Sequence, residues 1–217
     1  MKITTQGEFS VLFIMATAVL LYSCSFKPSP KKIVEDMISV KNTHQVTASL
    51  EYFADDALLE IPKMGIKMEG KEGRRAIAEY DSVLNTILAP SNFAISGDTV
   101  FCSVTEHNDW IEAAEIPDAY YPRVMFVVKD NKISYNFAEL ADSSKENFER
   151  VLDHFVFWGN DKYPEKMKTM APEGDFIYNA ENGIMVVDML REWKAEQKQG
   201  KREPVSGRMP KRLDKNK

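Results

Sequence analysis

Apolar residues recur at intervals of three and four over residues 33–38 and again over residues 46–53. This spacing predicts two short amphipathic helices, because it places the apolar side chains on one face of a helix. Residues 57–61 form a short apolar run that stops at Pro62, and residues 66–68 form another. Short apolar runs bounded by turn residues are typical of strands. We therefore expect two helices followed by two short strands.

A longer amphipathic helix is expected next, ending before Pro90. Its apolar face carries Ala76, Ile77, Tyr80, Leu84 and Leu88. Three extended runs follow, at residues 100–110, 123–128 and 132–139. The sequence Lys129-Asp-Asn131 predicts a hairpin turn between the last two, since Asp and Asn tolerate positive φ. Helices segregated from an antiparallel group of strands indicate the α+β class rather than a parallel α/β sheet.

Two more helices are expected within residues 141–197. In the first, a capping box from Ser143 to Glu146 precedes an apolar stripe of Phe148, Val151, Leu152, Phe155 and Trp158. The second follows a linker rich in Lys, Met and Pro, and its stripe comprises Val186, Met189, Leu190 and Trp193. Each stripe needs a partner that buries it. We expect this C-terminal helical extension to pack on the preceding domain, as a lid over a pocket mouth or a brace outside the sheet.

The composition fits an ordinary folded domain. The 217 residues are 44% hydrophobic and carry a net charge of −5, a balance that is too apolar for a disordered chain. Two cysteines are too few for a disulfide framework or a four-ligand zinc site. The excess of acidic side chains argues against general nucleic-acid binding, so no nucleic acid is expected among the partners.

The N-terminus has the pattern of a secretion signal. The apolar run at residues 11–22 is short for a permanent membrane span and suits the core of a signal peptide. Leu21-Tyr22-Ser23-Cys24 resembles a bacterial lipobox, which implies removal of residues 1–23 and attachment of acyl chains such as palmitate at Cys24. Residues 24–30 would then be a tether that holds the domain at a membrane of the bacterial cell envelope, facing the periplasm or the exterior. The alternative is an uncleaved anchor.

The C-terminus is strongly basic. Residues 198–217 carry eight Lys and Arg against two acidic residues, a net charge of +6, and contain two Gly and two Pro without apolar periodicity. This composition predicts a flexible tail. The tail either keeps the protein soluble or docks on an anionic surface. The body between signal and tail is left markedly acidic, with a net charge of −11.

Strand alternation supplies the candidate site. From Val100 onward, alternate residues put Glu106, Asn108 and Trp110 on the face of Val100, Cys102 and Val104, which is expected to point inward. Desolvation there would raise the Glu106 pKa toward that of a general base or acid. Tyr80, on the apolar face of the long helix, is a third lining group. Two alternatives stay open. In the first, Glu106 and Asn108 lie past the buried stretch, in water. In the second, the strand has the opposite alternation, and His107 and Asp109 point inward.

Three segments, taken in order, resemble a known family. Residues 52–62 read Tyr-Phe-Ala-Asp-Asp-Ala-Leu-Leu-Glu-Ile-Pro, residues 70–77 read Gly-Lys-Glu-Gly-Arg-Arg-Ala-Ile, and a hairpin strand begins at Lys132. Residues 31–140 thus resemble the nuclear transport factor 2-like (NTF2-like) superfamily, its SnoaL-like branch especially. The resemblance implies a cone-shaped α+β barrel, with a curved and mostly antiparallel sheet wrapped around a long helix to enclose a pocket, and often a homodimer. The superfamily includes ketosteroid isomerase and polyketide cyclases, and also members that only bind or assemble, so the fold does not choose the function.

The isomerase mechanism does not carry over. Aligned through Phe53-Ala-Asp-Asp56, its general base falls at Ile61, and its two oxyanion groups fall near Met37 and Val124. All three residues are apolar here. No phosphate-binding, dinucleotide-binding, metalloprotease or hydrolase motif occurs, and no cofactor or metal is expected.

Three functions remain open. The first is a membrane-tethered module that binds a small, largely apolar molecule beside Tyr80, Glu106, Asn108 and Trp110. The second is a structural or partner-binding lipoprotein whose interior is filled by its own side chains. The third is a cofactor-free enzyme of the cyclase, isomerase or dehydratase type, with Glu106 or His107 as its general base.

Replacing the candidate lipidation residue tests the tether. We expect Cys24→Ser to move the protein from the membrane fraction to the soluble fraction, because the thiol that accepts the lipid is removed. Fractionation of cells followed by immunoblotting measures this. Continued membrane association of Cys24→Ser would show that the lipoprotein prediction is wrong.

Overall fold

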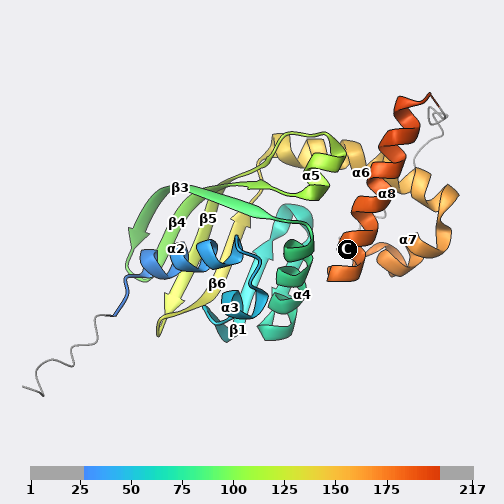
Figure 1. The fold of residues 1–217 in the computed structure, drawn as a ribbon. Coiled ribbons are helices and arrows are strands. Elements are labelled where there is room, and N and C mark those ends of the chain that lie inside the picture. Colours follow the sequence, from blue (N-terminus) through green and yellow to red (C-terminus); the bar gives the residue numbers. More distant parts are fainter. Residues whose placement is uncertain (1–26, 201–217) are drawn as a thin grey trace, which may run out of the picture.

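A computed structural model describes residues 27–200 of the chain (Figure 1). One curved sheet of six strands contains β1 (Phe53–Ile61), β2 (Ile66–Glu69), β3 (Ile87–Ser96), β4 (Thr99–His107), β5 (Ala119–Lys129) and β6 (Lys132–Glu139). The strand order is β2-β1-β6-β5-β4-β3, and only β1 and β6 run parallel. The predicted α+β class is confirmed. In the part of the chain that the structure describes, β2 and β3 are the edges of the sheet, which does not close into the expected barrel.

Helices lie against one face of this sheet and beyond one end of it. Against the face lie α2 (Pro30–Lys41), α3 (Val46–Leu50) and α4 (Gly70–Val83), and past the end of β4 lie α5 (Asp109–Ala114), α6 (Asp142–Lys162), α7 (Pro164–Met170) and α8 (Ala180–Lys198) (Figure 1). Short 3-10 turns occupy Pro62–Met64 and Pro172–Gly174. Within residues 27–200, no helix is long and apolar enough to cross a membrane.

Local sequence explains several of these elements. The Ser29 hydroxyl accepts a hydrogen bond from the Lys32 backbone N–H at 3.2 Å, and Pro30 occupies the first turn, so α2 begins where both residues favour a helix start. Its buried face is the predicted one, made of Ile33, Val34, Met37 and Ile38. Between β5 and β6, Asp130 and Asn131 have φ values of 49° and 61°. Two positive φ values define the primed turn that fits a two-residue hairpin, so the predicted turn is confirmed.

The long helix is shorter than its periodicity predicts. Helix α4 ends at Val83, and Asn85 takes a left-handed φ of 51° before β3 begins. Leu88 therefore lies in a strand, and Pro90 lies inside that strand rather than marking a helix end. Pro90 is tolerated because, among residues 27–200, β3 is an edge strand paired with β4 alone. A strand over Ile87–Ser96 was not expected from the sequence.

The extended run that was expected to reach Trp110 stops earlier. Strand β4 ends at His107, and the Asn108 side-chain oxygen accepts a hydrogen bond from the Ile111 N–H at 2.9 Å, which caps the start of α5. The alternation of side chains consequently breaks at Asn108. Trp110 belongs to a helix, and strand parity does not apply to it.

The C-terminal helices form as expected, but without the predicted capping box. Ala141, the residue that precedes α6, makes no side-chain cap, and the Ser144 hydroxyl inside the helix accepts a hydrogen bond from the Tyr120 N–H at 3.0 Å. Helix α7 lies where a linker was expected. Helix α8 includes Lys198, which was assigned to the tail and which forms an ion pair with Glu115.

Helix α8 packs against the end of α4 and against α5, and α6 packs against α7 and α8. Gly183 in α8 permits the closest approach, because a Cβ atom there would lie 2.8 Å from Val83 Cγ2 and 3.2 Å from the Tyr80 ring. Tyr80 also meets Phe176 and Tyr178 with ring centroids 5.9 Å and 5.2 Å apart. This contact brings the segment before α8 to the interior of the domain.

Candidate functional site

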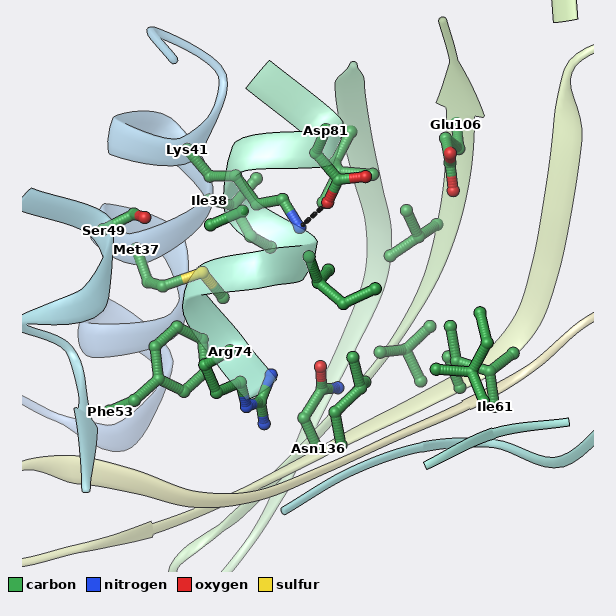
Figure 2. A pocket seen from close by; sticks show the side chains of 18 of the residues that line it. Met37, Ile38, Lys41, Ser49, Phe53, Ile61, Arg74, Asp81, Glu106 and Asn136 are labelled. Carbon is green, nitrogen blue, oxygen red and sulfur yellow. Dashed lines mark ion pairs between the residues drawn. The ribbon is translucent and has the colours of Figure 1, made fainter. Parts of the chain in front are cut away.

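A cavity of about 150 Å³ lies between the sheet and the helices α2, α3 and α4 (Figure 2). A cavity of this size accommodates a molecule of about one aromatic ring. Its walls are mostly apolar and include Met37, Ile38, Leu59, Ile61, Val124 and Phe126. The charged groups that reach it are Lys41, Arg74, Asp81 and Glu106.

Glu106 is held in the cavity wall by two hydrogen bonds. It lies on β4 two residues after Val104, and both residues line the cavity, on the face that strand alternation predicts. The Tyr121 hydroxyl donates to one carboxyl oxygen at 3.0 Å, and the Asn108 side-chain N–H donates to the other at 2.8 Å. A carboxyl group restrained at both oxygens presents a defined face to the cavity.

Asn108 acts on Glu106 rather than on the cavity itself. Its side chain is buried, its oxygen caps α5 through Ile111, and its N–H group restrains Glu106. Asn108 is not among the cavity-lining residues. The structure therefore places this predicted ligand-binding residue behind Glu106, as a positioning residue.

The environment of Glu106 disfavours its charge. Burial, followed by the nearby Asp81 carboxylate, raises the pKa of Glu106 to about 7, although Lys41 and the two hydrogen bonds act in the opposite direction. Lys41 and Asp81 form an ion pair of 2.7 Å at the same end of the cavity (Figure 2). Glu106 is consequently present in both protonation states near neutral pH.

Three tyrosines line the cavity near Glu106. Burial raises the pKa of Tyr80, raises that of Tyr178 to about 12 and, together with the charge of Glu106, raises that of Tyr121 well above its ordinary value. All three hydroxyls therefore stay protonated at neutral pH and can donate hydrogen bonds. Tyr80 lines the cavity as predicted, whereas Tyr178 comes from the C-terminal extension and was not predicted to line it.

Arg74 occupies the part of the cavity away from Glu106 (Figure 2). It is only 6% exposed, donates one hydrogen bond to the Leu58 carbonyl at 3.0 Å and stacks 4.3 Å from the centre of the Phe53 ring. Burial lowers its pKa to about 10, so it remains charged at neutral pH. Arg74 was not among the site residues predicted from the sequence. Its position three residues before Ile77 and seven before Asp81 is the signal that places it on the inner face of α4.

Two predicted site residues lie elsewhere. His107 points outward with its side chain 51% exposed, and its Nδ1 lies 2.8 Å from an Asp118 oxygen. Trp110 is buried against Phe148, with ring centroids 5.3 Å apart, and does not line the cavity. The alternative parity that would turn His107 inward is not adopted, because Val104 and Glu106 occupy the inner face. Cys24 lies outside the described residues.

The positions derived from the isomerase resemblance do belong to the cavity. Met37, Ile61 and Val124 all line it, and all contribute apolar side chains. The three positions where that resemblance would place the catalytic groups therefore carry no acid or base. Among residues 27–200, no group of three or more metal-binding side chains comes together.

Comparison with known proteins gives similarities of fold. No protein-family model and no curated protein matches the chain. The epoxide hydrolase/cyclase-like enzyme SalBIII, described in pyran ring formation in the polyether salinomycin, is 17% identical with a TM-score of 0.47, over 53% of this chain and 92% of that chain. An NTF2-like protein of unknown function from Cytophaga hutchinsonii is 12% identical with a TM-score of 0.45, over 55% and 96%.

A third similar structure is a hypothetical protein from Catenulispora acidiphila with a ketosteroid isomerase-like fold, in complex with trimethylamine. It is 18% identical with a TM-score of 0.47, over 54% of this chain and 90% of that chain.

The raised pKa of Glu106 predicts how stability depends on pH. The folded protein binds the Glu106 proton more tightly than the unfolded chain, whose pKa is near 4.5. The stability that protonation provides is therefore present at low pH and is lost as pH rises through about 7. Gln does not ionise, so Glu106→Gln should not lose stability over this pH range. We expect the wild type to lose about 2 kcal/mol of unfolding free energy, a value that allows for the partial exposure of Glu106.

Urea unfolding at about pH 5 and about pH 8 measures the difference. Glu106→Gln should gain stability relative to the wild type at the higher pH and change little relative to it at the lower one. Glu112→Gln, on the exposed surface of α5, serves as the control. An equal change at both pH values would contradict the raised pKa.

Proposed function

We propose that this protein binds a small, largely apolar molecule in the cavity and that a lipid on Cys24 tethers it to a membrane of the bacterial cell envelope. The observation that carries the binding function is the restrained Glu106 carboxyl in a mostly apolar cavity wall. Pockets of this kind use apolar walls for affinity and a few placed polar groups for orientation. The homodimer that the family resemblance implies stays a prediction.

The apolar wall supplies the affinity in this proposal. Each square ångström of apolar surface removed from water contributes about 25 cal/mol, and the cavity is lined by side chains from two layers of the fold. Tyr178 adds a wall from the C-terminal extension, so the extension takes part in enclosing the ligand. The tyrosine hydroxyls and Glu106 then orient a ligand that has one polar group.

A specific observation favours a second function, proton transfer. A general base works best when its pKa lies near the working pH, and the Glu106 pKa is raised to about 7. The nearby Tyr80 and Tyr178 hydroxyls would stabilise negative charge that develops on a ligand oxygen. In this reading, Glu106 takes a proton from carbon in a reaction of the cyclase, isomerase or dehydratase type.

Filling the cavity tests binding. We expect benzyl alcohol to bind to the wild-type protein and Ala78→Phe to abolish that binding, because Ala78 lines the cavity and a phenyl ring would occupy the ligand volume. Saturation-transfer NMR measures the effect. Ala76→Phe, on the same helix but outside the cavity lining, should retain binding. Equal binding to both variants would show that the ligand does not enter the cavity.

Hydrogen–deuterium exchange tests proton transfer without a known substrate. We expect the protein to speed the exchange of the α-protons of cyclohexanone in D2O, with a rate that rises through about pH 7 as Glu106 ionises. Glu106→Gln should remove the acceleration, because an amide does not accept the proton. His107→Ala should leave it intact, since His107 is outside the cavity. An unchanged rate in Glu106→Gln would mean that Glu106 is not the base.

A further inference from the structure

Arg74 is a buried positive charge without a negative partner. No carboxylate within residues 27–200 forms an ion pair with it, and its Nε atom is buried without any hydrogen-bond partner. The arginines that do pair with carboxylates are Arg75, Arg123 and Arg191, whose side chains are 36%, 63% and 55% exposed. Arg74 is therefore more deeply buried than these three arginines, yet it lacks the carboxylate partner that each of them has.

Burying such a group is unfavourable unless something compensates it. A guanidinium carries five N–H donors in a planar fork. The Leu58 carbonyl accepts a hydrogen bond from one of its nitrogens. The Phe53 ring stabilises the charge through its π face. Neither contact neutralises the charge, and an unpaired buried charge costs several kcal/mol. Arg74 lines the cavity, so a ligand can supply the missing anion.

The other charged groups of the cavity do not supply it. Lys41 and Asp81 neutralise each other in a 2.7 Å ion pair. Glu106 is partly protonated near neutral pH and lies at a separate place from Arg74 in the cavity (Figure 2). Tyr121 and Asn108 already hold both Glu106 oxygens. The cavity consequently has an excess of positive charge at the Arg74 end.

We propose that the ligand carries a carboxylate, which Arg74 binds, while its apolar body extends toward Glu106. This inference rests on the proposed binding function and specifies the chemical class of the ligand as a small apolar monocarboxylic acid. A planar guanidinium matches a carboxylate with two parallel hydrogen bonds. A single cation suits a single negative charge, and the cavity of about 150 Å³ suits a body of about one ring.

Phenylacetate and its neutral analogue phenylacetamide test the proposal by calorimetric titration. We expect the wild-type protein to bind phenylacetate about tenfold or more tightly than phenylacetamide, the equivalent of one charge-assisted hydrogen bond. Arg74→Met should abolish this preference and keep binding of phenylacetamide. Arg75→Met, at the next and more exposed position, should retain the preference. Arg74→Lys should retain part of it, because it keeps the charge without the fork.

Thermal unfolding separates these outcomes from misfolding. Without ligand, Arg74→Met should be as stable as the wild type or more so, because an uncompensated buried charge is removed. A preference for phenylacetate that persists in Arg74→Met would overturn the proposal. Binding of phenylacetamide without any preference in the wild type would also overturn it, while leaving the proposed binding function intact. Failure of both compounds and of benzyl alcohol to bind would count against the binding function itself.

Discussion

The concave face of the curved sheet has to be covered, and the way in which it is covered determines where the site lies. Six twisted strands form a surface that straight helices meet only along part of its width. Helices α2 and α4 pack against it, α3 packs against both of these helices, and the aromatic contact of Tyr80 with Tyr178 brings in the C-terminal extension. Protein interiors are ordinarily close-packed. Here a cavity remains between the two layers, and its lining includes charged side chains.

The charged side chains of that cavity differ in how their charges are compensated. Glu106 is satisfied by its neighbours: Tyr121 and Asn108 donate to its oxygens, and burial lets it accept a proton near neutral pH. Lys41 and Asp81 satisfy each other. Arg74 has an aromatic ring and one carbonyl but no anion among residues 27–200. The polar groups of an apolar cavity orient whatever enters it, so this asymmetry gives the cavity two chemically distinct ends.

Much of the local structure could be predicted from sequence, because it depends on neighbouring residues. The helix that begins at Pro30, the Asp130-Asn131 turn and the inward face of β4 up to Glu106 follow from capping, positive φ and alternation. Predictions were wrong where periodicity was extended too far. Leu88 continues a helical spacing but lies in β3, and Trp110 continues a strand alternation that Asn108 interrupts. Both errors arise because hydrophobic spacing does not mark where an element ends.

The sequence by itself determined the class of fold and the acidic balance of the body between two contrasting termini, and it gave the inward position of Glu106 as one of three alternatives. It could not show that Arg74 is buried without a carboxylate among the described residues, that Tyr178 lines the cavity or that Tyr121 holds Glu106. Those relations join α4 to β1, the segment before α8 to α4, and the end of β4 to β5. Burial and charge pairing depend on which surfaces meet in three dimensions, so only the tertiary structure decided which charges remain unpaired.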